Sequence, residues 1–410
     1  MKKELVTLIF ANCLAVSAGS FAYAAEEEKA YNDSAMTQSF NGTKEALANM
    51  GIAATLDYKA DFMSNVAGGV KRRGEFLDNT DLKVTFDGEK LYNVKGSKIF
   101  LYAINNNGGR PNDAAGTVQG VDNIEVSART AKLYEAWIEQ NFMDDQFSLR
   151  TGLYDLNSEF YVTDSSGLFI NSTFGIGTEI AQTGVNGPSI FPTTSFGGRF
   201  KWQPDEKTYV QVAVLDGVAG DPHNPQGTHV QFNDRDGVLG IAEASHTFDF
   251  ARFAVGAWEY SERSDDLTEV DASGNPVKSR NNGFYVMSEK EICPKTTAFV
   301  RFGMADQDLN QTDYSWATGV TVDKIVPGRD NSQLGFAVTG AHNSDKYMTS
   351  QSAGGTPADN METGFELTYS DNLLPWLRIQ PDIQYTINPG TNPDLDDSWM
   401  IGVRFEVAAW

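Results

Sequence analysis

From about residue 51 onward, apolar and polar side chains alternate along segments of roughly ten residues. A period of two residues is that of a β-strand with one apolar and one polar face. Clusters of Gly, Asn, Asp and Pro separate the segments and mark turns. In the clearest segment, residues 133–142, one face carries Tyr134, Ala136, Ile138 and Phe142, and the other carries Glu135, Trp137 and Glu139. The chain is therefore expected to be all-β beyond a short N-terminal region.

The segments predict a transmembrane antiparallel β-barrel of about sixteen strands. Tight turns alternate with long polar connections, which is how such barrels lie in a membrane. The long connections are residues 156–193, 216–236, 262–282 and 341–360. The expected strands begin near Gly51, Glu75, Ser97, Ala131, Gln146, Thr194, Thr208, Gly237, Ala251, Gly283, Thr296, Tyr314, Gln333, Glu362, Trp376 and Ser398.

The longest connection, residues 156–193, is too apolar at its centre for a loop in water. Residues 167–175 read Gly-Leu-Phe-Ile-Asn-Ser-Thr-Phe-Gly, and the connection ends in Ile190-Phe191-Pro192. A long loop in a compact structure usually has a functional reason. We expect this loop to fold into the lumen, where it would bury these groups and form a constriction.

The N-terminus has the features of a secretory signal peptide. Lys2 and Lys3 are followed by a largely apolar stretch over residues 5–18, and Ala22-Tyr23-Ala24 has the small side chains of a cleavage site. Lys44 to Met50 is the best short helix. The sequence therefore predicts a signal peptide over residues 1–24, a periplasmic segment with a short helix over 25–50, and an outer-membrane barrel over 51–410.

Bulk composition leaves the membrane question open. The mean hydropathy of −0.36 is that of a soluble protein. A barrel gives the same value, because each strand faces lipid with only every second residue. The net charge of −23 argues against nucleic acid as a partner.

A large soluble β-sandwich or β-helix is the structural alternative, since it alternates as well. Arg and carboxylates recur beside Gly and aromatic residues on the polar face, as in a crowded aqueous lumen, and the chain ends on Trp410. Aromatic residues near segment ends are expected to form girdles at the membrane interfaces. They are Tyr154, Phe160, Trp202, Tyr209, Trp258, Tyr260, Trp376 and Trp399. These features favour the barrel.

Several strings of residues resemble the carbohydrate-selective porin family (OprB type). The resemblance is densest between residues 42 and 220, and its order along the chain is more specific than any one string. The strings are residues 65–69, 133–140, 152–157, 168–172 and 209–217. The resemblance implies a sixteen-stranded barrel in the outer membrane of a Gram-negative cell that passes monosaccharides such as glucose by facilitated diffusion.

The polar face supplies candidates for contact with a sugar. Both signs of charge face one lumen, which gives hydrogen-bond donors and acceptors with little net field. An aromatic ring can receive the C–H face of a sugar. The candidates are Glu135, Trp137 and Arg150, then Glu139, Tyr154 and Arg199, with Arg110 if the loop at residues 105–111 bends inward. Expected partners are small carbohydrates and outer-membrane lipids, and both a monomer and a homotrimer remain open.

Other functions receive less support. A general porin, or one specific for another solute, is the first alternative, and an outer-membrane hydrolase or a purely structural barrel is less favoured. The four histidines are scattered, with no metal-ligand spacing around them. Ser245 and His246 are neighbours on a strand, so they point to opposite faces and cannot act as nucleophile and base. We expect no enzyme activity, no cofactor and no metal.

Overall fold

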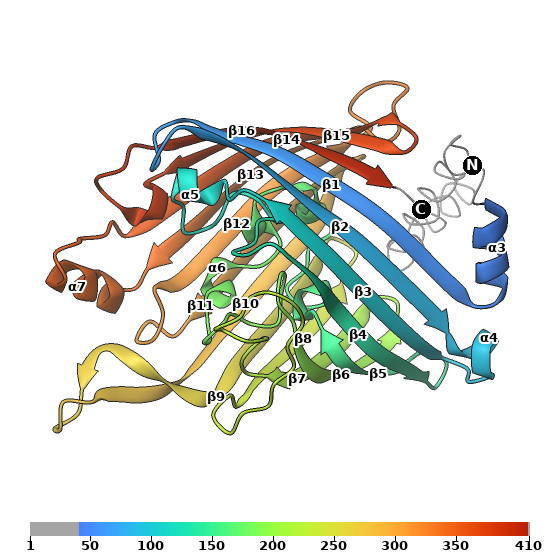
Figure 1. Cartoon of the computed structure of the whole chain (residues 1–410), viewed down its shortest axis with the longest axis horizontal. Coiled ribbons are helices and arrows are strands. Elements are labelled where there is room, and N and C mark those ends of the chain that lie inside the picture. Colours follow the sequence, from blue (N-terminus) through green and yellow to red (C-terminus); the bar gives the residue numbers. More distant parts are fainter. Residues whose placement is uncertain (1–40, 409–410) are drawn as a thin grey trace.

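The computed structural model describes residues 41–408, which form one closed barrel of sixteen antiparallel strands (Figure 1). Helix α3 (Asn41–Asn49) covers most of the helix expected at residues 44–50. The expected signal peptide, residues 1–24, and residues 25–40 lie outside the described part, so the division of the chain into three regions stays a prediction. In the described part, no helix is long and apolar enough to cross a membrane.

The sixteen expected strands are confirmed. Every expected start lies within two residues of an observed one, except that of β10. The strands are β1 (Ile52–Ala67), β2 (Arg73–Asp87), β3 (Ser97–Gly108), β4 (Thr130–Phe142), β5 (Phe147–Tyr154), β6 (Ser195–Asp205), β7 (Thr208–Asp216), β8 (Val238–Thr247), β9 (Arg252–Val270), β10 (Pro276–Cys293), β11 (Thr296–Ala305), β12 (Thr312–Asp323), β13 (Gln333–Asn343), β14 (Met361–Leu374), β15 (Leu377–Ile387) and β16 (Ser398–Ala408).

Residues 262–282, expected as a long loop, are instead the outer part of the β9–β10 hairpin, which projects beyond the barrel (Figure 1). Lys278 pairs with Asp265 at 3.0 Å, and Arg280 pairs with Glu259 at 3.1 Å. Both faces of this ribbon meet water, so its sequence carries no apolar alternation from which a strand could be predicted.

The two ends of the barrel differ. Tight turns such as residues 206–207 and 294–295 lie at one end, together with α3 and α4 (Gly88–Tyr92). Long connections lie at the other end, where α5 (Asn112–Ala115) and α7 (Asp345–Ala353) are found (Figure 1). We call these the short-turn end and the long-loop end.

Apolar side chains cover the outside of the barrel. The exposed ones include Phe62, Leu101, Ile138, Val212, Val255, Val300, Phe336, Leu367 and Ile401. The side chains between them point inward, where carboxylates and arginines are buried. A barrel that faces lipid requires this arrangement, with apolar side chains outside and charged side chains inside.

Two expectations about side-chain direction are wrong. Tyr134, expected on the lipid face, is only 2% exposed and points inward, because a register shift in the β3–β4 pair puts Tyr134 and Glu135 on the same side. Several aromatic residues expected in interfacial girdles are also buried inside the barrel. They are Tyr154, Phe160, Trp258 and Tyr260.

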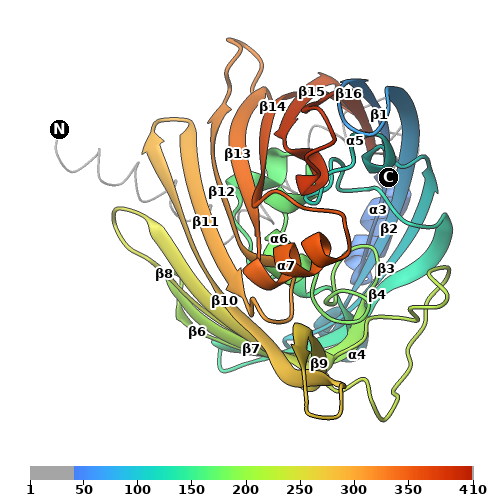
Figure 2. The same cartoon turned by 90° about the vertical axis from the view of Figure 1, so that its left-hand side faces the viewer.

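Two connections fold into the lumen and fill much of it (Figure 2). Loop A, residues 155–194, joins β5 to β6 and contains the short helix α6 (Thr178–Ala181). Loop B, residues 109–129, joins β3 to β4. The inward fold of loop A was expected from its apolar centre. For loop B, an inward bend was considered only as the condition under which Arg110 would contact a sugar.

Candidate functional site

Buried carboxylates of β14 hold both inward loops. Glu366 accepts hydrogen bonds from the backbone N–H groups of Ile170 (2.6 Å) and Asn171 (3.0 Å) in loop A. Four residues earlier on the same face, Glu362 accepts bonds from the N–H groups of Val118 (2.8 Å) and Gln119 (3.0 Å) in loop B. Paired N–H groups aimed at a carboxylate are strong contacts, so each loop has a fixed seat on this wall.

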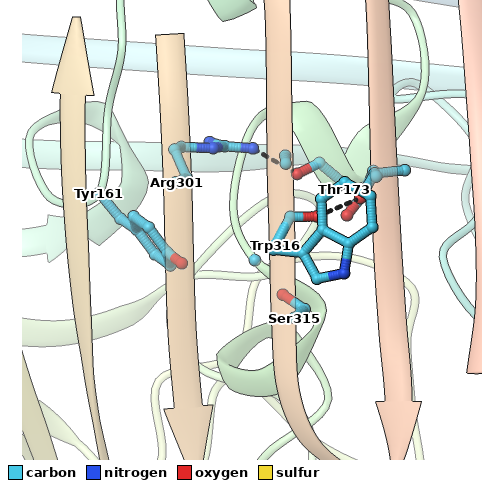
Figure 3. Close-up of a pocket in the computed structure, with 8 residues that line it drawn as sticks. Tyr161, Thr173, Arg301, Ser315 and Trp316 are labelled. Carbon is cyan, nitrogen blue, oxygen red and sulfur yellow. Dashed lines mark hydrogen bonds between the residues drawn. The ribbon is translucent and has the colours of Figure 1, made fainter.

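Loop A is also held from β11 and β12 (Figure 3). Arg301, 1% exposed, donates to the carbonyl oxygens of Thr173 (2.6 Å) and Gly175 (3.1 Å). The Ser315 hydroxyl donates to the Glu179 carboxylate of α6. Arg301 therefore faces the lumen, but it binds the loop and is closed off from water.

Small inward residues on β11 and β13 make room for loop A. A Cβ at Gly303 would collide with the Glu179 carboxylate, and a Cβ at Gly335 would lie 2.9 Å from the Phe169 ring. Ala317 and Ala337 continue this surface beneath Phe169 and Phe174. The inner face of these strands is therefore shaped to receive the loop.

Loop B reaches the closing seam of the barrel. Arg404 of β16 binds Asp61 of β1 at 2.6 Å and donates to the Asn123 side-chain oxygen at 2.7 Å. The two loops also bind each other, since the Asn123 N–H donates to Ile170 O at 2.9 Å. Together they cover the β8–β16 side of the lumen. Inward side chains of the opposite wall stay half-buried; they include Lys59, Lys83, Lys98, Phe100, Tyr102 and Lys201.

A row of charged side chains crosses this uncovered wall. Lys98 of β3 lies opposite Glu139 of β4, Glu139 opposite Arg150 of β5, and Arg150 opposite Arg199 of β6. The Glu139 carboxylate binds Arg150 at 2.8 Å and Arg199 at 2.6 Å. The strand pairing therefore brings together three of the residues predicted as pore-lining.

Glu159 of loop A completes the group. Its carboxylate binds Arg199 at 2.8 Å and Arg150 at 3.3 Å, and it accepts a hydrogen bond from the Tyr154 hydroxyl at 2.6 Å. We call Glu139, Arg150, Glu159 and Arg199 the charge quartet. Its two positive and two negative groups balance, so it offers fixed donors and acceptors without a net charge.

The predicted site residues fall into two groups by their access to the lumen. Arg150 and Glu139 keep side-chain exposures of 11% and 9%. Arg199, 2% exposed, is the buried member of the quartet, and Tyr154, 1% exposed, supports the quartet from behind. Arg110 lies at the mouth, 48% exposed, and binds Asp113 at 3.2 Å. It is not brought to the quartet.

Trp137 supports Arg150. The Arg150 guanidinium lies 3.9 Å from the centre of the indole ring, and the Phe100 ring lies 4.9 Å from it. The Trp137 indole N–H donates to Glu135 at 3.1 Å, and Glu135 also accepts a bond from the Asp155 N–H at 3.3 Å. With both neighbours in place, Trp137 is 8% exposed and serves to position Arg150.

Sequence reasoning missed one member of the quartet and three residues beside it. Glu159 lies in the loop, where no period assigns a direction to its side chain. Lys98, Phe100 and Lys201 lie on alternating strands, and their inward register could have been read from the same pattern as Arg150. A cavity of ≈ 460 Å³ opens on the short-turn side of the quartet and is lined in part by Glu139, Lys98 and Asn141.

Comparison with known proteins identifies the family of this barrel. A model of the family described as "Carbohydrate-selective porin, OprB family" matches residues 71–408. The chain belongs to the carbohydrate-selective porin family. This porin is 21% identical to Porin B of Pseudomonas aeruginosa over an alignment of 434 residues, gaps included. The alignment covers 96% of this chain and 95% of that protein.

Solved structures show the same fold. A high-pH structure of OprB from Pseudomonas putida has a TM-score of 0.79 at 19% identity and covers 90% of this porin and 96% of its own chain. The DcaP channel of Acinetobacter baumannii has a TM-score of 0.55 at 10% identity, covering 87% of this porin and 97% of its own chain. Its membership of the carbohydrate-selective porin family makes this porin an outer-membrane channel for carbohydrates and not an enzyme, as the sequence predicted.

Proposed function

We propose that small neutral sugars such as glucose diffuse through this porin along the wall left uncovered by the two loops, and that the charge quartet is where they bind. The observation that carries the proposal is the balance of Glu139, Arg150, Glu159 and Arg199. Sugar hydroxyls both donate and accept hydrogen bonds, and the quartet presents both kinds of partner in fixed positions. Because its charges cancel, the quartet does not trap an ion in the pore.

The roles of the residues follow from their access to the lumen. Arg150 and Glu139 contact the sugar hydroxyls, and Glu159 accepts from them on the loop side. Phe100, half-buried beside Trp137, receives the apolar C–H face. Trp137, Tyr154, Glu135 and Arg199 hold these groups in place. Binding of this kind must stay weak, because a sugar that binds tightly does not leave the channel.

Liposome swelling tests the function directly. Purified protein in liposomes should admit glucose-sized neutral sugars faster than amino acids of equal size, with slower entry of disaccharides. Equal rates for all solutes of one size would indicate a general porin, and exclusion of all sugars would overturn the proposal. The same preparation, examined by light scattering in detergent, distinguishes a monomer from a homotrimer.

A further inference from the structure

The cavity on the short-turn side of the charge quartet has the size of a binding site. Its volume of ≈ 460 Å³ lies within the range of about 300–1,000 Å³ that is usual for small-molecule sites. Strands β1, β2, β3 and β4 supply most of its wall, together with the end of α3, which lies beside α4 (Figure 1). Glu139 lines this space and also belongs to the quartet, so the two are adjacent. We call this space the short-turn cavity.

Two neutral polar side chains in the short-turn cavity have no partner. The Thr85 hydroxyl of β2 and the Asn141 amide of β4 belong to its wall, and neither makes a hydrogen bond within residues 41–408. Half-buried polar groups are normally hydrogen-bonded, so these two are available to a ligand or to water. A hydroxyl and an amide supply donors and acceptors without charge, which matches the hydroxyl groups of a sugar.

Charged side chains of both signs surround these two groups. The cavity is lined by four carboxylates and three lysines, so neither sign dominates. Asp87 and Lys90 also fix its shape. Asp87 accepts bonds from the N–H groups of Glu89 (2.9 Å) and Lys90 (3.2 Å), and the Lys90 ammonium donates to the Ala48 carbonyl oxygen of α3 at 3.0 Å. The cavity is therefore suited to a neutral molecule rather than to an ion.

The short-turn cavity lies where a sugar would leave the quartet. Asn141 follows Glu139 by two residues on β4 and faces the same side, about 7 Å further along the strand. Thr85 lies directly opposite Phe100 in the β2–β3 pair. A sugar that leaves Arg150 can thus stay in contact with Glu139 as it reaches Asn141. Because long loops face the outside of the cell in such barrels, this step leads toward the periplasm.

We propose that the short-turn cavity is a second binding site for neutral monosaccharides, in which Thr85 and Asn141 bind the hydroxyl groups of a sugar that has passed the quartet. The inference rests on the proposed function, because the quartet delivers the sugar to the cavity. Two weak sites in sequence suit a channel better than one tight site, since neither holds the solute for long.

Protection of a thiol tests whether glucose occupies the cavity. Cys293→Ser removes the exposed cysteine of the described chain, and Ala53→Cys then places a thiol in the cavity wall. The protein in detergent is reacted with a small, water-soluble thiosulfonate at increasing concentrations of glucose. A ligand at ten times its dissociation constant occupies about nine-tenths of its sites, so modification should slow about tenfold at that concentration.

Val94→Cys in the same background is the matched control. Val94 is exposed at the short-turn end but does not line the cavity, so glucose should not slow its modification. Asn141→Leu, combined with Ala53→Cys, should raise the glucose concentration for half-protection about tenfold, which is the effect of one lost hydrogen bond. Thr85→Val, which keeps the shape of the side chain, provides the same measurement if Asn141→Leu does not fold.

The outcomes separate this inference from the proposed function. Equal modification rates with and without glucose, or equal slowing at both thiols, would overturn the second site if glucose still enters liposomes through the wild-type channel. Undiminished protection in Asn141→Leu and Thr85→Val would overturn it as well, because the sugar would then be held by other groups. Glucose that neither enters liposomes nor protects the thiol would overturn the proposed function.

Discussion

Arg150 lies directly opposite Arg199 on the neighbouring strand, a position in which two like charges repel each other. Glu139 and Glu159 make this arrangement stable, because each carboxylate binds both guanidinium groups at distances from 2.6 to 3.3 Å. One carboxylate comes from the wall and the other from loop A. The quartet therefore links the loop to the wall at the point where a sugar would pass.

Removal of Arg150 should unbalance the quartet. Arg150→Ala leaves two carboxylates facing one arginine, so we expect the pore to shift its preference toward cations. Block of the ion current by glucose should weaken about tenfold, which is the loss of one charge-assisted hydrogen bond of roughly 1.5 kcal/mol. Reversal potentials in a KCl gradient and titration of current noise with glucose measure the two effects.

Arg280→Ala is the control for this change. Arg280 forms an Arg–Glu pair with Glu259 of the same kind, but on the hairpin, where both side chains are more than half exposed. It should alter neither ion preference nor sugar block. The same shift in both variants would mean that the charge of the whole protein, and not the quartet, sets the selectivity.

Trp137→Ala should change the position of the Arg150 side chain without changing the charge of the pore. The indole ring lies against the Arg150 guanidinium, so its removal frees that side chain without changing the number of charges. We expect weaker sugar block with an unchanged reversal potential, and Trp137→Phe should recover most of the block because a ring remains. An altered reversal potential in Trp137→Ala would show that Arg150 had left the pore.

The quartet should also withstand acid. Burial alone would raise the pKa of the Glu159 carboxyl, but the guanidinium groups of Arg150 and Arg199 outweigh burial and hold the pKa at about 2. A lowered carboxyl pKa stabilises the folded state above the ordinary value of 4.5, and this contribution is lost as the pH falls toward 2. The temperature at which the barrel loses its heat-modifiable migration should therefore fall over this range, and fall less in Glu159→Gln. Glu259→Gln, with its exposed carboxylate, should follow the wild type.

The strand number and most side-chain directions were predictable, because a strand between lipid and water must alternate. Arg150 and Glu139 could be assigned to the lumen from that period alone. Where both sides of a segment meet water, as in the outer part of the β9–β10 hairpin, the period has no physical cause, and the extension of these two strands was missed. A single extra residue at Tyr134 reverses the direction assigned to its side chain, and nothing in the local sequence predicts this register shift.

The position of the two loops could not be read from the sequence. Nothing local connects Glu366 with Ile170, which is 196 residues earlier in the chain. One clue was available. Inward positions of β11 and β13 carry Gly303, Gly335 and Ala337, and small residues there imply that another segment fills the space. Once that wall is known to be covered, the opposite wall with Arg150 is the remaining path.

Loop A should form the constriction of the channel. Its centre is seated on β14 by the hydrogen bonds from Ile170 and Asn171 to Glu366, so deletion of residues 167–177 removes the seated part and empties that side of the lumen. We expect the single-channel conductance in planar bilayers to rise and glucose to be discriminated less from larger sugars. Glu366→Ala, which removes only the acceptor, should give a smaller rise with frequent closures as the loop moves. Shortening the hairpin at residues 271–275, outside the pore, controls for loop deletion in general and should leave conductance unchanged. An intact barrel with wild-type conductance after deletion of 167–177 would mean that the passage is narrowed elsewhere.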